Sequence, residues 1–503
     1  SKVDAMKGSY KWDEYLEKIL IKMNEDNDHD SQCSDYVVPA ECFYEAPFGE
    51  YAQHIVPNIK LEVALNDEST SYVDESTSLF WVANVQKIAG YRILVRYEGM
   101  DQKGDEANDL WINLGSSELR HVGFSAEDTD SRFLVPPMSI ARRRSDWPQY
   151  LLCHLHAYKT LPSTWPEIQK RKLNNFKFKK GDRVELLDGL VSMRVRPALI
   201  EAVIGSRVLV KVSAKDMNKS DLHRQDDEEE DNQIEEGIWM DHCSPLLFYV
   251  GWAYKVGYQL LANDEYKRHA SEIASALKAG SSRIPYAKND TRPEQFQDYI
   301  DCCKLKGEEK IFVEWEKGMK LEILDPLDTW KELRVATVLE VLADGYLKLG
   351  FDGEEMEEDC LPIHSASPLL FPVGYCEKYG LRIKGPQGEG KFDWKSHLKQ
   401  SKAIAAPEIL FEDDPPPSAV EKFKIGAKLE AVDMCEPHLI CAATVAAHKG
   451  RLLQIKYDGW DDSYDQLFDY RSNNIFPIGW CEMNGYKLEA PKMETKKKAK
   501  SKK

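Results

Sequence analysis

The sequence predicts a mainly β protein of four tandem units, each a small β-barrel core with a helical or extended N-terminal arm. Two short elements recur in the same order in every unit. The opening element, a basic residue and a glutamate among apolar positions, lies at residues 59–63 (IKLEV), 182–186 (DRVEL), 319–323 (MKLEI) and 427–431 (AKLEA). The closing element, an apolar residue, glycine and an aromatic residue, lies at residues 122–124 (VGF), 250–252 (VGW), 373–375 (VGY) and 478–480 (IGW). Between them, alternating apolar residues flank tight turns, a pattern typical of β-hairpins.

The length of the repeat indicates small domains. Successive openings lie much further apart than the roughly 20–50 residues of a solenoid repeat. A chain of 503 residues also suits three or four domains at about 150 residues each. The predicted boundaries are residues 10–138, 145–262, 293–386 and 392–491 for the four units, 263–292 for a helix and linker, and 492–503 for a basic tail.

Three hairpins can be placed within the units. In the fourth unit, a strand at 442–445 and a turn at 448–450 precede apolar side chains at alternate positions up to Tyr457. Similar patterns span residues 81–97 and 335–351, with turns at Ala89-Gly90 and Asp344-Gly345. Short strands joined by such turns favour a small barrel.

The arms ahead of the cores have a different pattern. Residues 10–19, 146–155 and 392–398 have apolar side chains at helical spacing. Residues 405–411 should be extended, because the residue before Pro407 is disfavoured in the α region. We expect each arm to pack on a neighbouring barrel. A helix expected at 264–279 precedes a Gly-Ser-Ser sequence, which marks the joint between the second and third units as a flexible linker.

Composition excludes several classes of protein. Apolar residues make up 42% and charged residues 30% of the chain, values typical of globular domains. No apolar run approaches the roughly 20 residues that span a bilayer, so we expect a soluble protein without membrane contact. The eleven cysteines include no C-x-x-C pair, although Cys302 and Cys303 are adjacent. This usage favours thiols in a reducing compartment, with no metal site and no cofactor.

Charge favours basic partners. The net charge is −18, and residues 496–503 contribute six lysines, so the rest of the chain carries −18 − 6 = −24. Such a body repels nucleic-acid phosphates and suits basic ligands, of which histone tails are an abundant class. A nucleic-acid-binding module, suggested by the tail and by the arginines at 142–144, is therefore an alternative, with DNA contact at most through the tail. The tail also matches a nuclear-localisation signal. The acidic run at 226–236 is read as a solvated loop, with binding of a basic tail as the alternative.

The openings, the closings, the tryptophan-led arms and residues 457–465 (YDGWDDSYD) together resemble the malignant-brain-tumour (MBT) repeat family, from about residue 10 to residue 491. The set of four repeats is similar to that of Polycomb-related repressor proteins, and the divergence of the first three is similar to that of a nematode member. The resemblance implies a non-enzymatic chromatin reader in the nucleus that acts in transcriptional repression. Its implied partners are methylated histone tails (H3 or H4) and other proteins of a repressor complex.

The resemblance also implies a binding site. Family pockets use an acidic residue just after the opening strand and three aromatic residues on a later strand and loop. In the fourth repeat the matching positions are Asp433, Tyr457, Trp460 and Tyr464. Glu436 stands where many members have asparagine, and it is a candidate residue of the pocket rim.

The chemistry of this set suits a methylated lysine. Methylation keeps the positive charge and adds apolar surface, so aromatic faces attract the group by about 0.5–2 kcal/mol per cation–π contact. Mono- and dimethyl-lysine retain an N–H that the Asp433 carboxylate can accept, whereas trimethyl-lysine has none. We therefore expect lower methylation states to bind best.

The first two repeats lack this set. The first has Leu65 at the acid position and Met100 at the tryptophan position, which leaves Tyr97 as its aromatic residue. The second keeps Asp188 but has Val212 at the first aromatic position. These positions are expected to be structural, in barrels that serve as scaffold or protein-docking surfaces.

The third repeat keeps more of the set. It has Asp325, Asp328 and Phe351, but Glu354 stands at the tryptophan position. An acidic residue directly after a strand is usually a turn residue. The third repeat is therefore also expected to be scaffold.

Two other functions compete with that of a chromatin reader. Cys435 and Cys441 lie near His438 and His448, but no third group orients a Cys–His pair, so no catalytic residue is predicted. The main alternative is a protein–protein scaffold of a repressor complex in which even the fourth pocket is empty. Binding of free methyl-lysine discriminates between the reader and the scaffold.

Overall fold

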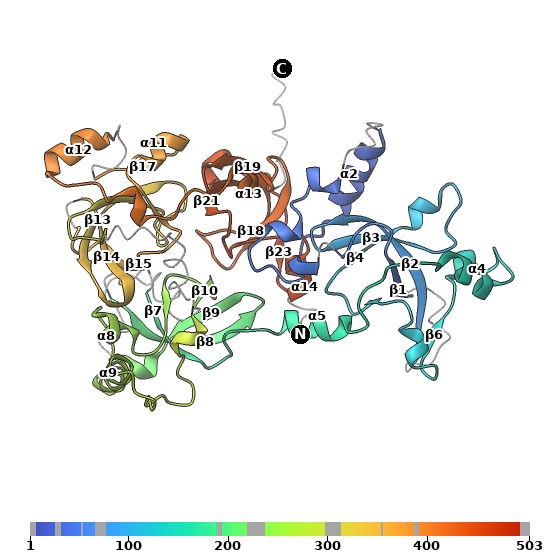
Figure 1. The fold of residues 1–503 in the computed structure, drawn as a ribbon, viewed down its shortest axis with the longest axis horizontal. Coiled ribbons are helices and arrows are strands. Elements are labelled where there is room, and N and C mark those ends of the chain that lie inside the picture. Colours follow the sequence, from blue (N-terminus) through green and yellow to red (C-terminus); the bar gives the residue numbers. More distant parts are fainter. Residues whose placement is uncertain are drawn as a thin grey trace, which may run out of the picture.

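The computed structural model confirms a mainly β protein of four repeats. Four curled antiparallel sheets, one in each repeat, follow one another along the chain (Figure 1). The residues described are 7–25, 32–51, 54–65, 77–187, 189, 194–218, 237–296, 313–353, 356–386 and 392–492. The acidic run at 226–236, the adjacent Cys302 and Cys303 and the lysines at 496–503 lie outside them. Among the described residues, no helix combines the length and the apolar character needed to cross a bilayer.

All four sheets have the same strand order. In the first sheet the order is β4 (Leu110–Asn113), β3 (Arg92–Tyr97), β2 (Ser78–Ala89), β1 (Lys60–Ala64), β5 (Leu119–Arg120). In the second it is β10 (Ile238–Asp241), β9 (Arg207–Val212), β8 (Arg196–Ile204), β7 (Arg183–Leu186), β11 (Leu247–Phe248). In the third it is β15 (Cys360–His364), β14 (Tyr346–Phe351), β13 (Leu333–Val341), β12 (Lys320–Ile323), β16 (Leu370–Phe371). In the fourth it is β21 (Gln466–Asp469), β20 (Leu452–Tyr457), β19 (Ile440–Lys449), β18 (Lys428–Val432), β22 (Ile475–Phe476).

The predicted hairpins are confirmed as β2–β3, β13–β14 and β19–β20. The register shifts at one equivalent place in each, for example between Val445 and Ala447 in β19. Such a bulge bends a strand and increases its twist, which explains how the sheets curl. Short parallel strands extend three sheets: β6 (Arg132–Leu134) pairs with β2, β17 (Ile383–Lys384) with β13 and β23 (Leu488–Glu489) with β19.

The glutamate of the opening element ties each sheet to its closing element. Buried Glu430 accepts hydrogen bonds from the backbone N–H groups of Gly479 (2.7 Å) and Cys481 (2.8 Å). Gly479 has φ +86° and precedes helix α14 (Trp480–Asn484), which explains why this position is glycine. Equivalent bonds join Glu62 to Gly123 and Ser125, Glu185 to Gly251 and Ala253, and Glu322 to Gly374 and Cys376.

Each arm packs on another barrel, as expected. In α12 (Trp394–Ser401), the indole of Trp394 donates to Glu322 of the third barrel at 2.7 Å. The first arm, with helix α2 (Asp13–Glu25), instead reaches the fourth barrel, where Trp12 donates to Glu430 at 2.9 Å. The helices of the other arms are α4 (Trp147–His154) and α5 (Trp165–Leu173), which pack on the first barrel, and α9 (Asp264–Lys278), which packs on the second. The arms of repeats two to four thus dock on the preceding core, and the first arm closes a ring.

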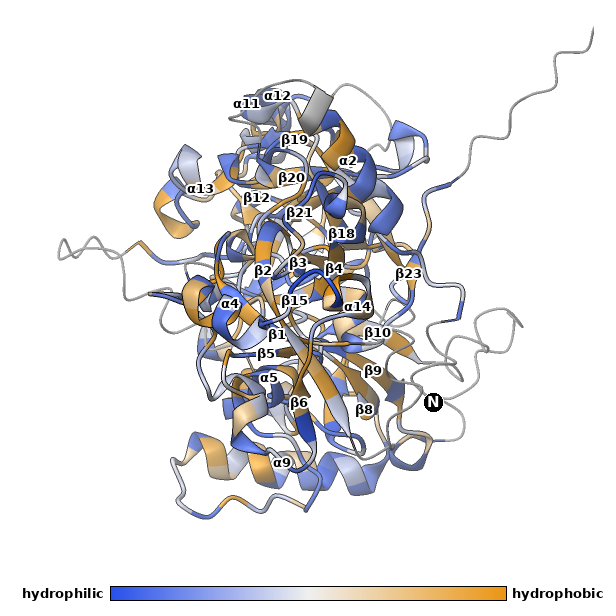
Figure 2. Cartoon of the chain, turned by 90° about the vertical axis from the view of Figure 1, so that its right-hand side faces the viewer, coloured by the Kyte–Doolittle hydropathy of each residue, from blue (hydrophilic) through white to orange (hydrophobic). Residues whose placement is uncertain are grey.

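The helix expected at 264–279 is confirmed as α9 (Asp264–Lys278), but the prediction of a flexible linker after it is wrong. Helix α9 is amphipathic (Figure 2) and buries Tyr266, Ala270 and Ile273 against the second barrel. Beyond it, Asp290 pairs with Arg183 in a parallel bridge, and its side chain is 0% exposed. The segment is therefore the docked arm of the third repeat, and its Gly-Ser-Ser sequence is a turn.

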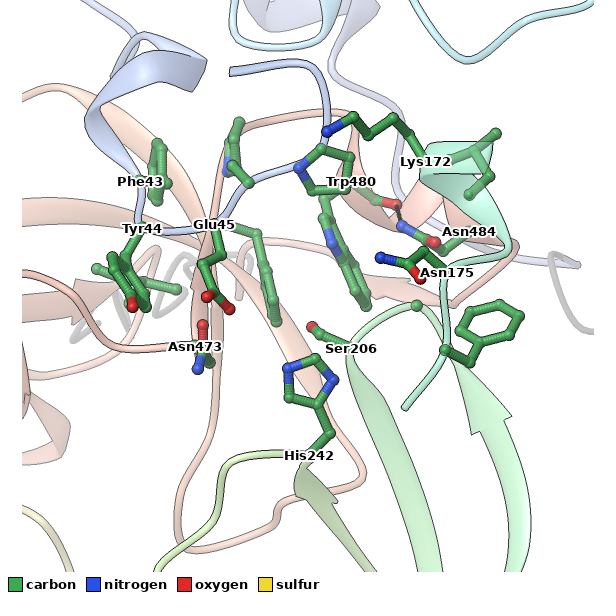
Figure 3. Close-up of a pocket in the computed structure, with 18 of the residues that line it drawn as sticks. Phe43, Tyr44, Glu45, Lys172, Asn175, Ser206, His242, Asn473, Trp480 and Asn484 are labelled. Carbon is green, nitrogen blue, oxygen red and sulfur yellow. Dashed lines mark hydrogen bonds between the residues drawn. The ribbon is translucent and has the colours of Figure 1, made fainter. Parts of the chain in front are cut away.

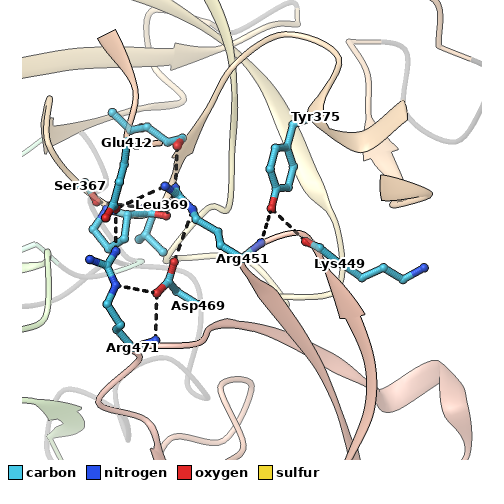
Figure 4. Close-up of polar contacts among 10 residues, drawn as sticks. Ser367, Leu369, Tyr375, Glu412, Lys449, Arg451, Asp469 and Arg471 are labelled. Atoms are coloured by element: carbon cyan, nitrogen blue, oxygen red, sulfur yellow. Dashed lines mark hydrogen bonds and ion pairs between the residues drawn. The ribbon is translucent and has the colours of Figure 1, made fainter. Parts of the chain in front are cut away.

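The hairpin tips lock the repeats together. Arg451, at the tip of the fourth hairpin, is buried in the closing region of the third repeat, where it donates to the Leu370 carbonyl at 2.8 Å (Figure 4). The Tyr375 hydroxyl, in α11 (Tyr375–Tyr379), accepts from the Arg451 N–H at 3.0 Å. Similarly, Tyr346 packs edge-on against Trp252 of α8 (Trp252–Val256), and Arg207 is buried against the fourth repeat. Repeats two, three and four therefore hold one another in a triangle.

The first repeat joins this triangle at one side. The N–H of Tyr91, at its hairpin tip, donates to the Ile478 carbonyl at 3.0 Å, and Arg92 pairs with Glu482 of the fourth repeat at 2.7 Å. A cavity of about 370 Å³ lies where the first, second and fourth repeats meet, between the labelled side chains of Lys172, His242 and Trp480 in Figure 3. The two remaining short helices are α3 (Met138–Ala141) and α13 (Pro417–Glu421).

Candidate functional site

The predicted acid lies in the loop after the first strand of the fourth sheet. Asp433 directly follows β18, and its Oδ1 accepts hydrogen bonds from the Cys435 N–H (3.0 Å) and from Nε2 of Gln466 (2.9 Å). Within the described part of the chain, its Oδ2 has no donor. The carboxylate is thus held in place through one oxygen, while the other oxygen can accept a hydrogen bond from a ligand.

The first predicted aromatic residue is buried at the end of a strand. Tyr457 ends β20 and is 3% exposed, and its hydroxyl lies 2.6 Å from both the Val432 carbonyl and Oε1 of Gln466. Burial, followed by the negative charge of Asp433, raises the pKa of Tyr457 well above its usual value. The Tyr457 hydroxyl therefore stays protonated, and its hydrogen-bond partners are groups of the protein itself.

Gln466 connects Asp433 to Tyr457, and the sequence did not point to this residue. Its amide nitrogen binds Asp433, while its amide oxygen faces Tyr457 and accepts the Met434 N–H at 2.9 Å. The signal was present, because Gln466 is a buried polar residue on β21, next to apolar Leu467. A buried amide needs partners, and the nearby acid and tyrosine supply them.

The other two predicted aromatic residues are exposed and in contact. The turn at Asp458-Gly459, with Gly459 at φ +78°, redirects the chain after β20. Trp460 and Tyr464 then present rings with centroids 5.0 Å apart, inclined by 59°. Trp460 is 36% and Tyr464 47% exposed, so neither ring serves mainly to fill the core.

A half-buried polar triad fixes this turn. The Asp458 carboxylate accepts from Thr444 Oγ1 at 2.6 Å and from Lys428 Nζ at 2.7 Å. Because all three residues lie on or next to the strands, the loop that carries Trp460 starts from a rigid point. The side chains of Lys320, Thr337 and Asp352 form the same triad in the third repeat.

The exposed rings already attract ammonium groups of the chain itself. Lys331, from the third repeat, places Nζ 5.0 Å from the Tyr464 ring centroid, and Lys492 places Nζ 4.0 Å from the Trp460 ring centroid. A cation near an aromatic face is stabilised by the electrons of the ring. The site is thus chemically suited to a cationic ligand.

Glu436 lies in the same loop as Asp433, whose carbonyl accepts its backbone N–H at 3.0 Å. It is exposed, its carboxylate is 3.6 Å from the His438 ring, and it lines a cavity of about 410 Å³ between repeats two, three and four. Trp239 and Trp330 line the same cavity. A contact between Glu436 and a ligand in the cage therefore stays a prediction.

The corresponding positions in the first two repeats are filled by core residues. Leu65 and Met100 are buried, and the Tyr97 hydroxyl lies 3.4 Å from the Ala64 carbonyl. Val212 is buried in the second core, while Asp188 lies outside the described residues.

In the third repeat the acid is already neutralised. Asp325 is buried and pairs with Arg334 at 2.7 Å, and Phe351 lies under the same guanidinium. Asp328 pairs with Lys384, and Glu354 lies outside the described residues.

The imagined cysteine–histidine pairs are not assembled. The His448 Nε2 lies 2.7 Å from the Phe423 carbonyl, and the His438 ring is next to Glu436. In the described ranges, no three side chains of His, Cys, Asp or Glu form a potential metal site.

Comparison with known proteins identifies the class. The sequence model of the mbt repeat matches residues 60–141, 182–267, 319–390 and 427–495. The chain therefore belongs to the MBT-repeat family, whose members are methyl-lysine-binding chromatin proteins rather than enzymes.

Several relatives share all or most of this architecture. MBT domain-containing protein 1 of Homo sapiens is 35% identical over 468 residues, which cover 92% of this chain and 66% of the relative. Protein lin-61 of Caenorhabditis elegans is 32% identical, covering 96% of this chain and 76% of that protein. Polycomb protein Sfmbt of Drosophila melanogaster is 32% identical, covering 90% of this chain and 35% of that protein.

A solved structure extends this comparison. The crystal structure of the four MBT repeats of Drosophila melanogaster Sfmbt, in complex with the peptide RHR(me)KVLR, matches with a TM-score of 0.76 at 30% identity. The match covers 97% of this chain and 100% of that one.

Proposed function

We propose that this protein is a nuclear chromatin reader whose fourth repeat binds mono- or dimethylated lysine on histone tails, H3 or H4. One observation carries the proposal: a carboxylate held by Gln466 stands beside a buried tyrosine, and the loop after this tyrosine carries an exposed pair of aromatic rings. The methylated peptide bound by the four repeats of Sfmbt supports the ligand class. Transcriptional repression, together with other proteins of a repressor complex, is the proposed role, in line with the Polycomb name of that relative.

Each residue has a distinct part in this proposal. Trp460 and Tyr464 enclose the methylated ammonium, and the ring of Tyr457 forms the floor. The free Oδ2 of Asp433 accepts the remaining N–H of mono- or dimethyl-lysine in a charge-assisted hydrogen bond. A trimethylated lysine has no such proton, so it keeps the cation–π attraction but loses the bond to Asp433.

Calorimetric titration of the intact chain with unmodified, mono-, di- and trimethylated histone peptides tests the proposal. We expect mono- and dimethyl peptides to bind more tightly than trimethyl peptides, and unmodified peptides to bind most weakly. Asp130→Asn, at an exposed position in the first repeat, is a control for the loss of one charge. Equal affinity for all four peptides would exclude a methyl-lysine reader.

A protein–protein scaffold is the second candidate function. The filled positions of the first three repeats and the cavities at the repeat junctions favour it. Free dimethyl-lysine amino acid separates the two functions, because a scaffold with an empty fourth pocket would not bind it.

The lysines at 496–503 are proposed to direct nuclear import and to make any contact with DNA. Truncation after residue 491 should then reduce nuclear accumulation and leave peptide affinity unchanged. If the lysines also contact DNA, affinity for nucleosomes should depend on salt more steeply than affinity for peptides.

A further inference from the structure

One strand position is equivalent in all four repeats. In each repeat, the residue directly after the buried glutamate of the opening element pairs with a residue on the next strand, and this second residue is the position in question. Strand register places Trp81 opposite Val63, Arg196 opposite Leu186, Arg334 opposite Ile323 and Cys441 opposite Ala431. The four equivalent residues are therefore two arginines, a tryptophan and one small residue, which belongs to the fourth repeat.

In the third repeat this residue binds the pocket groups. The Arg334 guanidinium donates to Asp325 at 2.7 Å, and its carbon atom lies 3.6 Å from the centroid of the Phe351 ring. Asp325 and Phe351 stand at the positions of Asp433 and Tyr457. The guanidinium thus occupies the place that the proposed function assigns to a methylated ammonium in the fourth repeat.

A second acid completes the site of the third repeat. Arg334 also donates to Asp359 at 2.6 Å. Leu361 pairs with Leu349 as Gln466 pairs with Ile455, and Asp359 precedes Leu361 by two residues as Tyr464 precedes Gln466. An acid therefore replaces an aromatic wall of the cage, which suits a guanidinium with N–H groups on both sides.

The carboxylate of Asp325 is buried, and it therefore needs the cation of Arg334 beside it. Burial raises the pKa of Asp325, and the hydrogen bond from the Leu327 N–H and the charge of Arg334 oppose that rise. The side chain of Asp325 is 3% exposed and that of Arg334 18% exposed. An unpaired carboxylate at this depth is strongly destabilising. The side of the guanidinium open to solvent indicates how a small cation could enter if Arg334 were shortened.

The first two repeats are also filled at this position. Trp81 is buried, packs edge-on against Trp147 with ring centroids 5.4 Å apart, and donates to the Glu98 carbonyl. Arg196 is likewise buried. In the fourth repeat, strand register puts the small thiol of Cys441 at this position, and burial, followed by the charge of Asp433, raises its pKa to about 12.

We propose that this strand position decides whether a repeat has an open pocket, and that Arg334 is an internal cation which occupies a preformed cation site in the third repeat. Trp81 and Arg196 fill the first two pockets, whereas Cys441 leaves the fourth open. The statement about the fourth repeat rests on the proposed function, whereas the cation site of the third repeat does not.

Exchange of the two residues tests the proposal. Arg334→Cys in the full chain removes the internal cation and introduces the side chain that the fourth repeat has at this position. We expect a lower melting temperature that millimolar guanidinium or methylguanidinium chloride partly restores, relative to sodium chloride of equal ionic strength. Wild type and Arg334→Cys/Asp325→Asn should show no such rise, because the site is occupied in one and has lost its acid in the other. An equal response in all three proteins would mean that Arg334 forms a structural ion pair only.

The reverse exchange gives an independent result, also in case Arg334→Cys does not fold. Cys441→Arg should place a guanidinium beside Asp433 and weaken dimethyl-lysine peptide binding about tenfold or more. Cys153→Arg, at an exposed cysteine of α4, adds the same charge away from the site and should bind like wild type. Full binding by a folded Cys441→Arg protein would overturn the proposal for the fourth repeat. If wild type binds no methyl-lysine, the proposed function fails, and the guanidinium experiment still decides the proposal for the third repeat.

Discussion

The third and fourth repeats share one backbone framework but present different side chains to the pocket. Both have the same strand order and the same polar triad of lysine, threonine and aspartate. In both, the buried glutamate of the opening element binds the backbone of the closing element. They differ at Arg334 and Cys441, at Asp359 and Tyr464, and at Leu361 and Gln466. The framework is therefore specified separately from the pocket, so a repeat can lose its ligand and keep its fold.

The largest effect should come from the shared framework. Glu430→Ala leaves two backbone N–H groups and the Trp12 indole without their acceptor in a buried site, which should cost about 3 kcal/mol or more of stability. Glu322→Ala should cost a similar amount in the third repeat. Urea unfolding followed by hydrogen exchange of the β18 and β12 amides would measure both, with exposed Glu421→Ala as control. If only one of the two substitutions lowered the free energy of unfolding, the frameworks of the two repeats would not be equivalent.

The next effect separates the two pockets. Asp433→Asn removes a charge-assisted acceptor, a contribution of roughly 1.5–3 kcal/mol, so dimethyl-lysine peptides should bind about tenfold more weakly or worse. Trimethyl peptides should change less.

Trp460→Ala should instead weaken all methylation states, because it removes a wall of the cage and leaves the hydrogen bond intact. Calorimetry of both variants against the methylation series measures the difference. Unchanged dimethyl binding in folded Asp433→Asn would place the pocket elsewhere.

A smaller effect concerns the arms. Trp394→Phe loses one indole hydrogen bond to Glu322 and should destabilise the third repeat by about 1–2 kcal/mol, although Trp394 lies in the arm next to the fourth. Trp12→Phe should do the same to the fourth repeat. Amide exchange resolved by repeat checks this, and destabilisation of the fourth repeat by Trp394→Phe would contradict the docking.

The smallest effect is expected at the acid of the third repeat. Asp325→Ala should leave methyl-lysine affinity within a factor of two or three, equivalent to about 0.4–0.7 kcal/mol, because Arg334 already occupies that site. The same titration series measures it. A loss as large as that of Asp433→Asn would mean that the third repeat also contributes a binding pocket.

Local patterns predicted much of the fold. Openings, closings and hairpins involve residues close together in the chain, and their alternation and turn residues are visible directly. The docking of the arms is different, because it depends on contacts such as Trp12 with Glu430, which lie 418 residues apart. The same limit explains the wrong linker, since Gly280 reads as a flexible element until the pairing of Asp290 with Arg183 is known.

The candidate site was predictable in part for the same reason. The resemblance to the MBT-repeat family pointed to Tyr457, Trp460 and Tyr464, which lie close together in the chain, at the end of one strand and in the loop after it. Gln466 and Arg334 were missed because their importance comes from strand register, which brings them next to acids on other strands. Periodicity alone does not reveal such a partner.

The docking of the first arm on the last barrel has a consequence for biosynthesis. Trp12, Leu16 and Ile19 belong to the same apolar cluster as Val432 and Ile440. Because a ribosome releases the N-terminal end of a chain first, these side chains wait for their partner until the fourth repeat has been translated. A nascent chain that ends before β18 would therefore carry an undocked amphipathic helix, a natural target for chaperones. The repeat proposed to read methylation is thus the last of the four repeats to be completed.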